Sequence, residues 1–590
     1  MCGIFGFVGG RRPAGDVILG ALRTLEYRGY DSWGVAVGVN GQIDVAKQAG
    51  RIGDAVAVVP AATIGFGHTR WATHGGVTDQ NAHPHLDCTG RFAVIHNGII
   101  ENFRTLKNEL LARGHEFASQ TDTEVVAHLI EEAVSGSEPS DLVTGLRAVF
   151  ARLRGLNAVI VLDNLTHHLA AVKNVSPLVL GRGPEGYYIA SDAVALVEHA
   201  GEIHYLNDGE VALLGAEGVQ LYDAKSGQER QPNFQPLTIT AADTSLHEYP
   251  HFMLKEIHEQ PRVLRAIGRD YGDYVKELAA LIRASQGTFL IGCGTASYAA
   301  LSGQYLFSRI ARRHVNFVVG SEFKYQEHFI NERSLVVALS QSGETADVIE
   351  SVLAAKARGA KIAALVNVQG STLDRLADFS VPLGAGPEQC VLSTKAYTAK
   401  LAILLLTAHE INGSGHAGKE WLWQAIDGVE RAISEESESL IRRIAASIVE
   451  RDHCFIIGRG LSYPAALEAA LKIKEVSYMH AEGFAGGELK HGVIALVEPG
   501  TPCIVYSPLD ETRDDILSGA MEMKSRGGQI IGVSPVNDEV FDIHVPVSDV
   551  GDASPIVNVI PAQLLGYQLA LLRGYDPDKP RNLAKSVTVK

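Results

Sequence analysis

The sequence predicts a multi-domain protein: an α+β domain of stacked β-sheets with helices, followed by two α/β domains whose parallel sheets carry helices on both faces. Its 590 residues suffice for several domains, and 46% hydrophobic residues can give each domain a core. The first third of the chain alternates short β-rich runs with turns, whereas the rest alternates long helices with continuous apolar strands. This second part also contains an internal repeat, which predicts two copies of one domain.

The N-terminal domain is expected at residues 2–220. Runs such as IFGFVG, WGVAVGV, FAVIHNGII and NAVIVLDN predict its strands, and the stretches 16–26 and 121–133 predict two helices. Thr121 and Glu124 have the spacing of a capping box at the start of the second helix. Residues 221–245 are polar and turn-rich without sustained periodicity, so we expect a linker there.

The C-terminal part repeats two stretches of sequence. FLIGCGTASYAAL at 289–301 is similar to FIIGRGLSYPAAL at 455–467, and the segment beginning ALSQSGETADV is similar to the one beginning VYSPLDETRDD. The offset between matching positions is nearly constant, from 166 residues between Gly292 and Gly458 to 168 between Gly359 and Gly527. We therefore expect two α/β domains at 279–418 and 445–580, followed by a C-terminal tail at 581–590.

The composition disfavours several classes of protein. A net charge of −16 argues against nucleic-acid binding, and no run of about 18 apolar residues predicts a membrane span. The six cysteines are scattered with no C-x-x-C pair, which is typical of proteins in a reducing compartment. These features predict a cytoplasmic protein with no nucleic-acid or membrane partner.

One strand-to-helix junction in the first α/β domain has the features of an anion site. Ser340, Gln341, Ser342 and Thr345 follow the buried strand SLVVAL, at the sheet edge where open α/β sheets bind ligands. The next helix points its free N–H groups at the same place, so the turn could hold a phosphate without a lysine. Alternatively, Ser342 and Thr345 are ordinary helix caps. The matching turn of the second domain, YSPLDETRDD, gains carboxylates and is not expected to hold phosphate.

Cys2 directly follows the initiator methionine, at the start of an apolar run. Two interpretations remain open from the residues alone: a small buried thiol at the start of a strand, or a nucleophile freed when Met1 is removed. In the second case, the α-amine of Cys2, with a pKa near 8, is a plausible base for its own thiol.

Several longer motifs identify a family. MCGIFGFVG, LEYRGYDS, GHTRWATHG, NAHPH, HNGIIEN and TDTE resemble the glutamine amidotransferase domain that has an N-terminal cysteine nucleophile. LSQSGETADV, STKAYTAK, KIKEVSYMHAE, GELKHG and PRNLAKSVTV resemble the paired sugar-isomerase (SIS) domains of the glutamine–fructose-6-phosphate aminotransferase family. The resemblance runs from Cys2 to the last residues. It implies that the amide nitrogen of L-glutamine is transferred to D-fructose 6-phosphate, giving D-glucosamine 6-phosphate and L-glutamate without a cofactor.

The resemblance implies roles for residues of the N-terminal domain. Cys2 would be the nucleophile, and the Asn97 side chain with the Gly98 backbone N–H would form the oxyanion hole. Arg70 would pair with the carboxylate of glutamine and Asp122 with its ammonium group. The full set of glutamine-binding residues is expected to be Arg70, Trp71, Thr73, His74 and Asp122.

The resemblance also implies roles in the isomerase half. Lys585 would form a Schiff base with the open-chain ketose, and Glu475 would move a proton between C1 and C2 of the sugar. His491 would open the sugar ring from the neighbouring subunit, which implies a homodimer. The residues expected to bind the sugar phosphate are Thr295, Ser340, Gln341, Ser342, Thr345, Val391 and Lys472. By spacing alone, Lys472 and Glu475 could equally be an ion pair on a solvated helix face.

The sequence departs from the family pattern at two positions, because Ala296 and Trp33 stand where other residues are commoner. Neither change removes a catalytic group. No metal is expected, because the spacing of the histidines and cysteine between positions 68 and 88 fits no common zinc module. Those residues are His68, His74, His83, His85 and Cys88. Two alternative functions remain open: an amidotransferase or deglycase of the same build acting on another sugar phosphate, and a non-enzymatic sugar-phosphate sensor.

Overall fold

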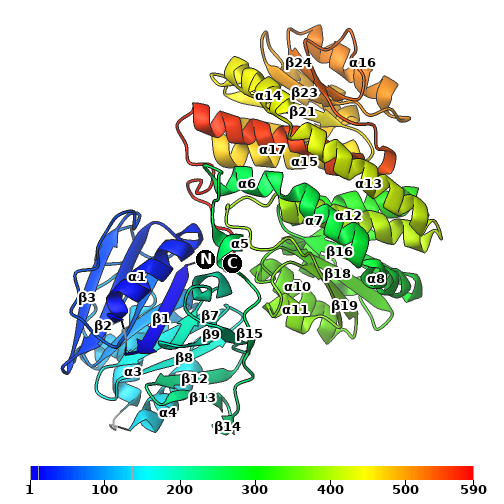
Figure 1. The fold of residues 1–590 in the computed structure, drawn as a ribbon. Coiled ribbons are helices and arrows are strands. Elements are labelled where there is room, and N and C mark those ends of the chain that lie inside the picture. The colour runs from blue at the N-terminus through cyan, green and yellow to red at the C-terminus, as the bar shows by residue number, and fades with distance from the viewer. Residues whose placement is uncertain (1, 11, 135–137, 589–590) are drawn as a thin grey trace. The chain divides into compact units, whose positions relative to one another are not determined.

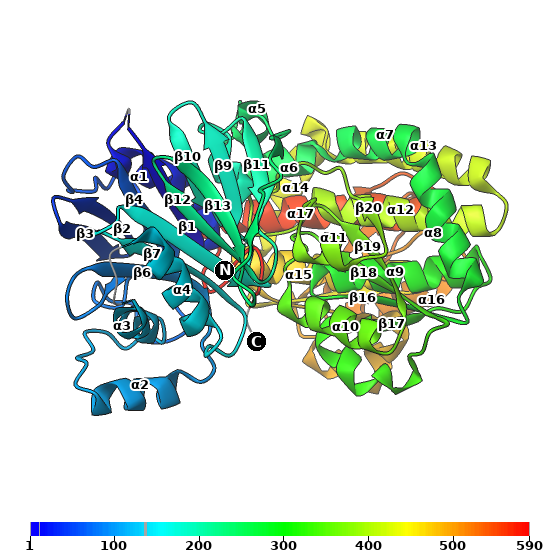
Figure 2. The same ribbon diagram turned by 90° about the horizontal axis from the view of Figure 1, so that it is seen from below.

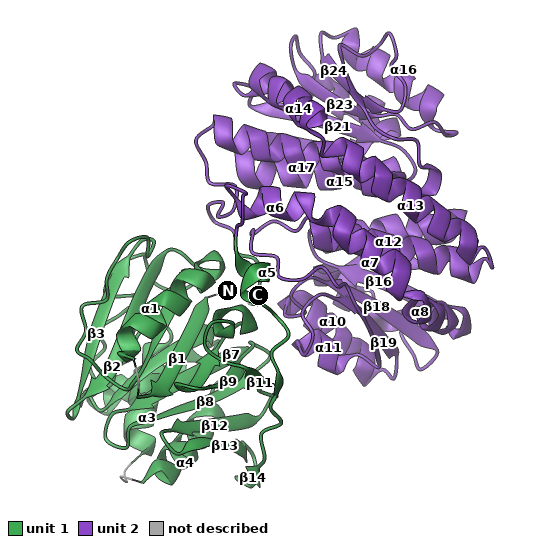
Figure 3. Cartoon of the chain, in the orientation of Figure 1, with its two compact units in different colours: residues 1–245, 584–590 green, residues 246–583 purple. Residues whose placement is uncertain are grey.

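The computed structural model describes residues 2–10, 12–134 and 138–588, arranged as two compact units (Figure 3). Unit 1 comprises residues 1–245 together with 584–590, and unit 2 comprises residues 246–583. The predicted tail is thus divided between the units, because its residues from 584 onward group with unit 1. The predicted loss of Met1 and the last two residues of the tail lie outside the described residues.

Unit 1 contains two antiparallel sheets. The first has the strand order β15-β11-β9-β10-β1-β4-β2-β3 and the second has the order β14-β13-β12-β8-β7-β6-β5. The strands of the first sheet are β1 (Gly3–Gly9), β2 (Ser32–Val39), β3 (Gln42–Ala49), β4 (Ile64–Arg70), β9 (Val179–Gly183), β10 (Gly186–Ala190), β11 (Glu202–Tyr205) and β15 (Gln235–Pro236). Those of the second are β5 (His85–Leu86), β6 (Phe92–Gly98), β7 (Asn157–Asp163), β8 (His168–Asn174), β12 (Glu210–Gly215), β13 (Gly218–Asp223) and β14 (Glu229–Arg230).

Alternation of side chains along the strands builds four layers, helix–sheet–sheet–helix. On β1, Phe5 and Phe7 point into the apolar core beneath α1 (Ala14–Leu25), whereas Ile4 and Val8 point into the core between the two sheets. The other face of the second sheet packs against α2 (Phe103–Ala112), α3 (Glu124–Ala133) and α4 (Pro139–Phe150). In Figure 2, α1 accordingly lies at one side of the sheets and α2 and α3 at the other.

Three details of unit 1 differ from the sequence-based expectation. α2 and α4 were not anticipated. The capping box was wrong: Thr123 is the N-cap of α3, the Glu124 carboxylate accepts from the N–H groups of Ala118 and Ser119, and Thr121 bonds His85 instead. The expected linker at 221–245 also carries structure, because the end of β13, then β14 and β15, pair with the two sheets and α5 (Ala241–Thr244) follows.

Unit 2 contains two parallel five-stranded sheets of identical topology, as the internal repeat predicts. Their orders are β17-β16-β18-β19-β20 and β22-β21-β23-β24-β25. The first sheet has β16 (Gly287–Gly292), β17 (Asn316–Val319), β18 (Ser334–Ser340), β19 (Lys361–Val366) and β20 (Phe379–Pro382). The second has β21 (His453–Gly458), β22 (His480–Ala485), β23 (Pro502–Tyr506), β24 (Gln529–Ser534) and β25 (Ile543–Pro546).

Helices between the two sheets join the halves of unit 2 into one continuous apolar core (Figure 1). The helices of this unit are α6 (Phe252–His258), α7 (Gln260–Asp270), α8 (Gly272–Ala284), α9 (Thr295–Arg309), α10 (Ala346–Ala357), α11 (Thr372–Leu376), α12 (Lys395–Ile411), α13 (Gly415–Ala432), α14 (Glu435–Ile448), α15 (Ser462–Ser477), α16 (Arg513–Lys524) and α17 (Ser554–Leu572). The stretch Gly551–Leu572 is long and apolar enough to cross a membrane, but 89% of its apolar window is buried inside the protein. It is therefore accounted for as a core helix.

Candidate functional site

Cys2 directly precedes β1, the strand that pairs with both β4 and β10 in the first sheet of unit 1. Its thiol is partly buried, and the backbone N–H of Trp71 donates to Sγ at 3.2 Å. Burial raises the pKa of the Cys2 thiol, while the Trp71 N–H and the charge of Arg70 oppose this shift. The thiol is thus held in place beside a donor and a cation, but it needs a base to become a thiolate.

Asn97 and Gly98, at the end of β6, lie beside Cys2. Asn97 Nδ2 donates to the Cys2 carbonyl oxygen at 2.9 Å, and its Oδ1 is 3.2 Å from His68 Nε2. Gly98 has φ +133°, and a Cβ there would lie 2.0 Å from the Leu156 carbonyl oxygen, so only glycine fits. The backbone conformation is therefore fixed at Gly98, whose N–H is one of the two predicted oxyanion donors.

The predicted glutamine-binding residues lie on β4, on the loop that follows it and just before α3. The buried Arg70 guanidinium donates to the carbonyl oxygens of His74, Gly75 and Gly76, so it currently anchors this loop. Burial lowers the pKa of Arg70, and the charges of Cys2 and Asp122 oppose that shift, which puts all three groups within electrostatic range. Asp122 is buried and accepts from the Ile100 N–H at 2.8 Å.

The remaining members of the predicted glutamine set lie on the loop itself. Trp71 and His74 are partly buried, and Thr73 is exposed. The His74 ring packs edge-on against Phe103 at 5.1 Å between ring centres. The structure thus gathers Cys2, Asn97, Gly98 and Arg70, and it leaves Thr73 facing solvent.

Four buried histidines support this site as neutral rings. Burial lowers the pKa of His68 and of His85 to about 3, and it also lowers the pKa of His83 and of His96. His68 stacks on His83 at 4.1 Å, and His83 meets His85 at 4.8 Å. His96 holds Thr123 and Asn157 through its two ring nitrogens. The five residues considered as a possible metal set do not converge, because Cys88 lies with His115 and His128 instead.

The second group of predicted residues lies on a buried face of α15, between the two halves of unit 2. Lys472 Nζ is 2.9 Å from Glu475, 3.4 Å from Glu468, and donates to Thr295 Oγ1 at 2.9 Å. Thr295 in turn donates to Glu468 at 3.1 Å. Thr295 belongs to the first domain copy and α15 to the second, so this cluster lies where the copies meet.

Charges in the α15 cluster shift one another's protonation. Burial raises the pKa of Glu468 to about 7, against the opposing charge of Lys472. Burial alone would lower the pKa of Lys472, but Glu468 and Glu475 outweigh it and hold the pKa above its usual range. The Lys472–Glu475 pair exists, but on a buried face and not on a solvated one. Sequence reasoning missed Glu468, although its spacing of four residues before Lys472 was a usable signal.

Val391 lies on the loop that borders this cluster. Its N–H donates to the Asp578 carbonyl oxygen at 3.1 Å, and the carbonyl oxygen of Ser393 accepts from Lys472 at 3.4 Å. The loop thus connects the α15 cluster to the segment that leads into the tail.

The predicted phosphate turn connects β18 to α10. Ser340 Oγ accepts from the Gly343 N–H and Ser342 Oγ from the Glu344 N–H, while Thr345 is the N-cap without a side-chain cap bond. Gly343 has φ +70°, and a Cβ there would lie 2.0 Å from Ser371 Oγ. The tight turn places Gln341, Ser342 and Thr345, all partly buried, at the helix N-terminus.

The matching turn of the second copy is filled differently. There, the Arg513 guanidinium donates to Ser507 Oγ and Ser534 Oγ, both at 3.1 Å, and pairs with Asp538 at 3.5 Å. Asp510 accepts from the N–H and hydroxyl of Thr512. The two turns therefore differ in their polar groups, and the expectation that the second copy holds no phosphate stays a prediction.

Two predicted catalytic residues lie elsewhere. His491 is exposed at the end of a 3-10 turn, Gly486–His491, and no hydrogen bond or ion pair between described residues joins it to the α15 cluster. Lys585 is half-buried in the part of the tail that groups with unit 1.

The two departures from the family pattern are accommodated locally. Trp33 is buried on β2 in the core beneath α1, with Val35 and Val37. Ala296 is buried in the first turn of α9, and Ser297 Oγ donates to the Gly294 carbonyl oxygen at 2.7 Å. Thr295 Oγ1 accepts from Lys472 in this turn, and its predicted contact with the sugar stays a prediction.

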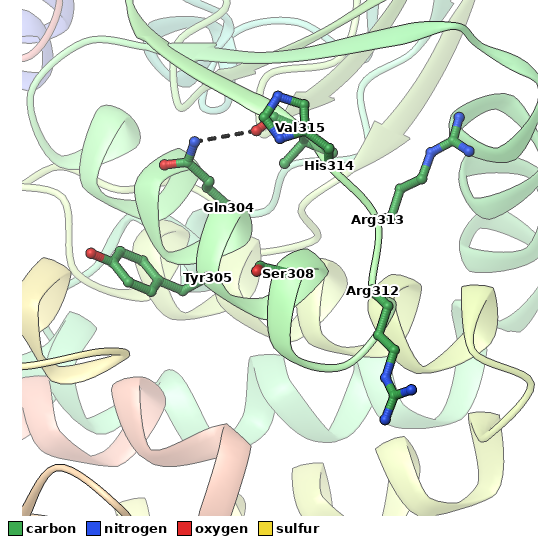
Figure 4. A pocket seen from close by; sticks show the side chains of 7 residues that line it. All are labelled: Gln304, Tyr305, Ser308, Arg312, Arg313, His314 and Val315. Carbon is green, nitrogen blue, oxygen red and sulfur yellow. Dashed lines mark hydrogen bonds between the residues drawn. The ribbon is translucent and has the colours of Figure 1, made fainter.

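A surface pocket near the end of α9 is separate from these groups (Figure 4). Gln304 and Tyr305 on α9, with the segment 312–315, line it, and Gln304 donates to the Val315 carbonyl oxygen. Thr295 is at the opposite end of the same helix, about 15–20 Å away at 1.5 Å per residue. This pocket is therefore not the predicted sugar site.

Comparisons with known proteins show which families the chain resembles. The family model described as "SIS domain" matches residues 281–410 and 447–573, and the one described as "Glutamine amidotransferase domain" matches 68–198. A glutamine–fructose-6-phosphate aminotransferase (isomerizing) from Thermococcus kodakarensis is 43% identical over 605 residues, and one from Thermus thermophilus is 42% identical over 613, each covering 100% of both chains. The solved C-terminal domain of glucosamine-fructose-6-phosphate aminotransferase from Francisella tularensis matches with a TM-score of 0.53 at 34% identity, covering 57% of this chain and 99% of that one.

Proposed function

Because the chain belongs to the glutamine–fructose-6-phosphate aminotransferase family, we propose that it transfers the amide nitrogen of L-glutamine to D-fructose 6-phosphate and isomerises the product. The products are D-glucosamine 6-phosphate and L-glutamate. The observation that carries the glutaminase half is the contact of Asn97 with Cys2, at 2.9 Å, beside the buried Arg70. A binding module would have no use for a thiol held next to amide donors and a cation.

The glutaminase half would work through the free α-amine of Cys2, once Met1 is removed. The amine takes the thiol proton, Sγ attacks the glutamine amide carbon, and the tetrahedral oxyanion forms beside Asn97 Nδ2 and the Gly98 N–H. When the oxyanion collapses, the C–N bond breaks and the amine gives its proton to the leaving ammonia. Water then hydrolyses the Cys2 thioester, which releases glutamate and restores the thiol. Arg70 exchanges its loop carbonyl partners for the substrate carboxylate, and Asp122 holds the substrate ammonium. Trp71, Thr73 and His74 then cover the site, which keeps the released ammonia from water.

The isomerase half would use the α15 cluster and the turn after β18. Ser340, Gln341, Ser342 and Thr345, with the N-terminus of α10, bind the phosphate. Lys585 forms a Schiff base at C2 of the open-chain ketose with loss of water. Ammonia from the glutaminase half adds at C2 and displaces the Lys585 amine, and Glu475 then moves the proton from C1 to C2. Lys472 pairs with the Glu475 carboxylate at 2.9 Å, while Thr295 and the Val391 backbone border the sugar.

His491 would open the sugar ring of the partner subunit's site, so the active form is a homodimer. Its exposure, and that of Leu496 five residues later, are consistent with a surface that a second copy covers. All six cysteines are free thiols, which agrees with a cytoplasmic location.

One assay tests both halves together. Purified protein is incubated with glutamine and fructose 6-phosphate, and glutamate and glucosamine 6-phosphate are both quantified, while the intact mass reports whether Met1 is absent. Glu475→Gln should keep glutamate release and lose the amino sugar. The matched control Glu436→Gln, at an exposed position of α14, should keep both products. Sugar-phosphate binding without either product, in protein that lacks Met1, would instead support a sensor.

A further inference from the structure

Four metal-ligating side chains meet in unit 1 outside the glutaminase site. Cys88 lies in the turn between β5 and β6, His115 follows α2, and His128 and Glu131 lie on α3. One donor atom from each lies within 4.8 Å of all the others. The glutamine and sugar chemistry proposed above uses none of these residues.

Local structure fixes each donor. His128 and Glu131 are three residues apart, which places them on the same face of α3. Gly114, at φ +95°, ends α2 so that the His115 N–H bonds the Leu110 carbonyl oxygen. The Cys88 N–H donates to Glu131 Oε2 at 3.1 Å, which ties the β5–β6 turn to the helix.

Four of the six donor–donor separations match the edges of a tetrahedral metal site. Cys88 Sγ is 3.6 Å from His115 Nδ1 and 3.5 Å from His128 Nδ1. Glu131 Oε2 is 3.2 Å from His115 Nδ1 and 3.4 Å from His128 Nδ1. From the usual zinc–ligand bond lengths, a regular tetrahedron has sulfur–nitrogen edges of about 3.6 Å and nitrogen–oxygen edges of about 3.4 Å.

The second ring nitrogen of each histidine faces a carboxylate. His115 Nε2 is within hydrogen-bond distance of Glu132 Oε1, at 3.2 Å, whereas His128 Nε2 is 3.9 Å from Glu124 Oε1, which is beyond that distance. Metal-binding histidines characteristically donate their other ring N–H to a carboxylate, which leaves the first nitrogen free as a ligand. In that tautomer both Nδ1 lone pairs, the sulfur and the Glu131 oxygen point into one small space.

Hydrogen bonding alone serves this arrangement poorly, because each Nδ1 faces both the thiol and the same carboxylate oxygen but can donate to only one of them. A divalent cation satisfies all four donors at once, and one thiolate with one carboxylate neutralises its charge. We infer that Cys88, His115, His128 and Glu131 form a tetrahedral site for one zinc ion. With four protein ligands the site has no open position, so the ion is structural: it joins the β5–β6 turn, the end of α2, and α3.

Because α3 follows closely after Asp122, a metal ion bound to this helix would also affect the predicted glutamine-binding site. Asp122 and Thr123 directly precede this helix, so a metal that fixes α3 also fixes the backbone of the predicted glutamine-binding residue. The inference does not depend on the proposed reaction, because metal content is measured independently of turnover.

Metal analysis of the full-length chain tests the site. The protein, purified without a histidine tag or chelator, should contain one zinc per chain. Cys88→Ala and His115→Gln should each weaken zinc binding by more than about 100-fold, and Glu132→Gln by about 10- to 100-fold, the range for a lost outer carboxylate. His416→Gln, at an exposed and unrelated histidine, is the matched control and should bind as the wild type does.

Titration with cobalt gives a second readout, because its spectrum reports directly whether the Cys88 sulfur binds the metal. The spectrum would not change if Cys88 only supported the fold. Wild-type protein should show the visible bands of tetrahedral cobalt and a near-ultraviolet thiolate charge-transfer band, and Cys88→Ala should lose the latter. Circular dichroism checks that each variant is folded. The inference is overturned if the wild type binds neither zinc nor cobalt stoichiometrically, or if Cys88→Ala and His115→Gln retain full affinity.

Discussion

Removing the buried cation of the α15 cluster tests the structural account of the isomerase half. Lys472→Met leaves Glu468 and Glu475 facing each other without the ammonium that lies 3.4 Å and 2.9 Å from them. At an effective dielectric constant of 20, an ion pair at 2.9 Å attracts by about 6 kcal/mol, of which desolvation offsets part. Breaking a buried pair by removing one partner costs about 3–5 kcal/mol, so we expect a loss of that size in the free energy of unfolding.

Urea unfolding at pH 8 measures this loss, and hydrogen exchange of peptides covering 462–477 locates it in α15. Adding Glu468→Gln to Lys472→Met should recover at least about 1 kcal/mol, because it removes one of the two facing carboxylates. Lys276→Met, which breaks an exposed pair with Asp273, is the matched control and should cost less than about 1 kcal/mol. A Lys472→Met cost as small as the control's would refute the reasoning.

Three further predictions concern the glutaminase site, its buried rings and the dimer. Asn97→Ala should lower the kcat of glutamate release by about 10²–10³-fold with its KM much less affected, and an unchanged kcat would exclude it from the oxyanion hole. His68 and His85 keep pKa values of about 3 when folded, so between pH 6.5 and 3 only the unfolded chain protonates them and stability falls with falling pH. Each ring should contribute about 1.4 kcal/mol per pH unit, and pH-dependent thermal melts of His85→Gln should show a shallower acid decline than the wild type. The inactive variants Glu475→Gln and His491→Gln, unfolded and refolded as an equal mixture, should regain about one quarter of wild-type synthase activity. Half of the refolded dimers contain one chain of each variant, and each such mixed dimer has one site with both wild-type residues. No regain of activity would place Glu475 and His491 of the same chain in one site.

The repeated architecture of unit 2 could be predicted because two stretches recur at a nearly constant offset. The two sheets have the same strand order for that reason. The strands of unit 1 were also predictable, since alternation along β1 divides Phe5 and Phe7 from Ile4 and Val8. Short strands were not: β14 and β15 have two residues each, which is too few for a visible period, so residues 221–245 were interpreted as a linker.

Local helix signals also had limits. α2 buries only Leu106 and Leu110, so its apolar pattern is weak in the sequence. The interpretation of Thr121 and Glu124 as a capping box failed because Glu124 turns back to the preceding loop.

In the candidate site, contacts between residues near in sequence could be predicted, whereas contacts between distant segments could not. The spacing of Lys472 and Glu475 is local, and their ion pair was foreseen. The approach of Thr295 to Lys472, 177 positions apart, depends on how the two domain copies pack. The same holds for Cys88, whose partners His115 and His128 come from separate segments.

Following the amide nitrogen itself tests the central claim most directly. Glutamine carrying a heavy-nitrogen amide is incubated with fructose 6-phosphate and the wild-type protein or Cys2→Ala, and the amino sugar is examined by mass spectrometry. The account predicts heavy glucosamine 6-phosphate and glutamate in equal amounts with the wild type, and neither with Cys2→Ala. Unlabelled amino sugar, or labelled product from Cys2→Ala, would contradict it.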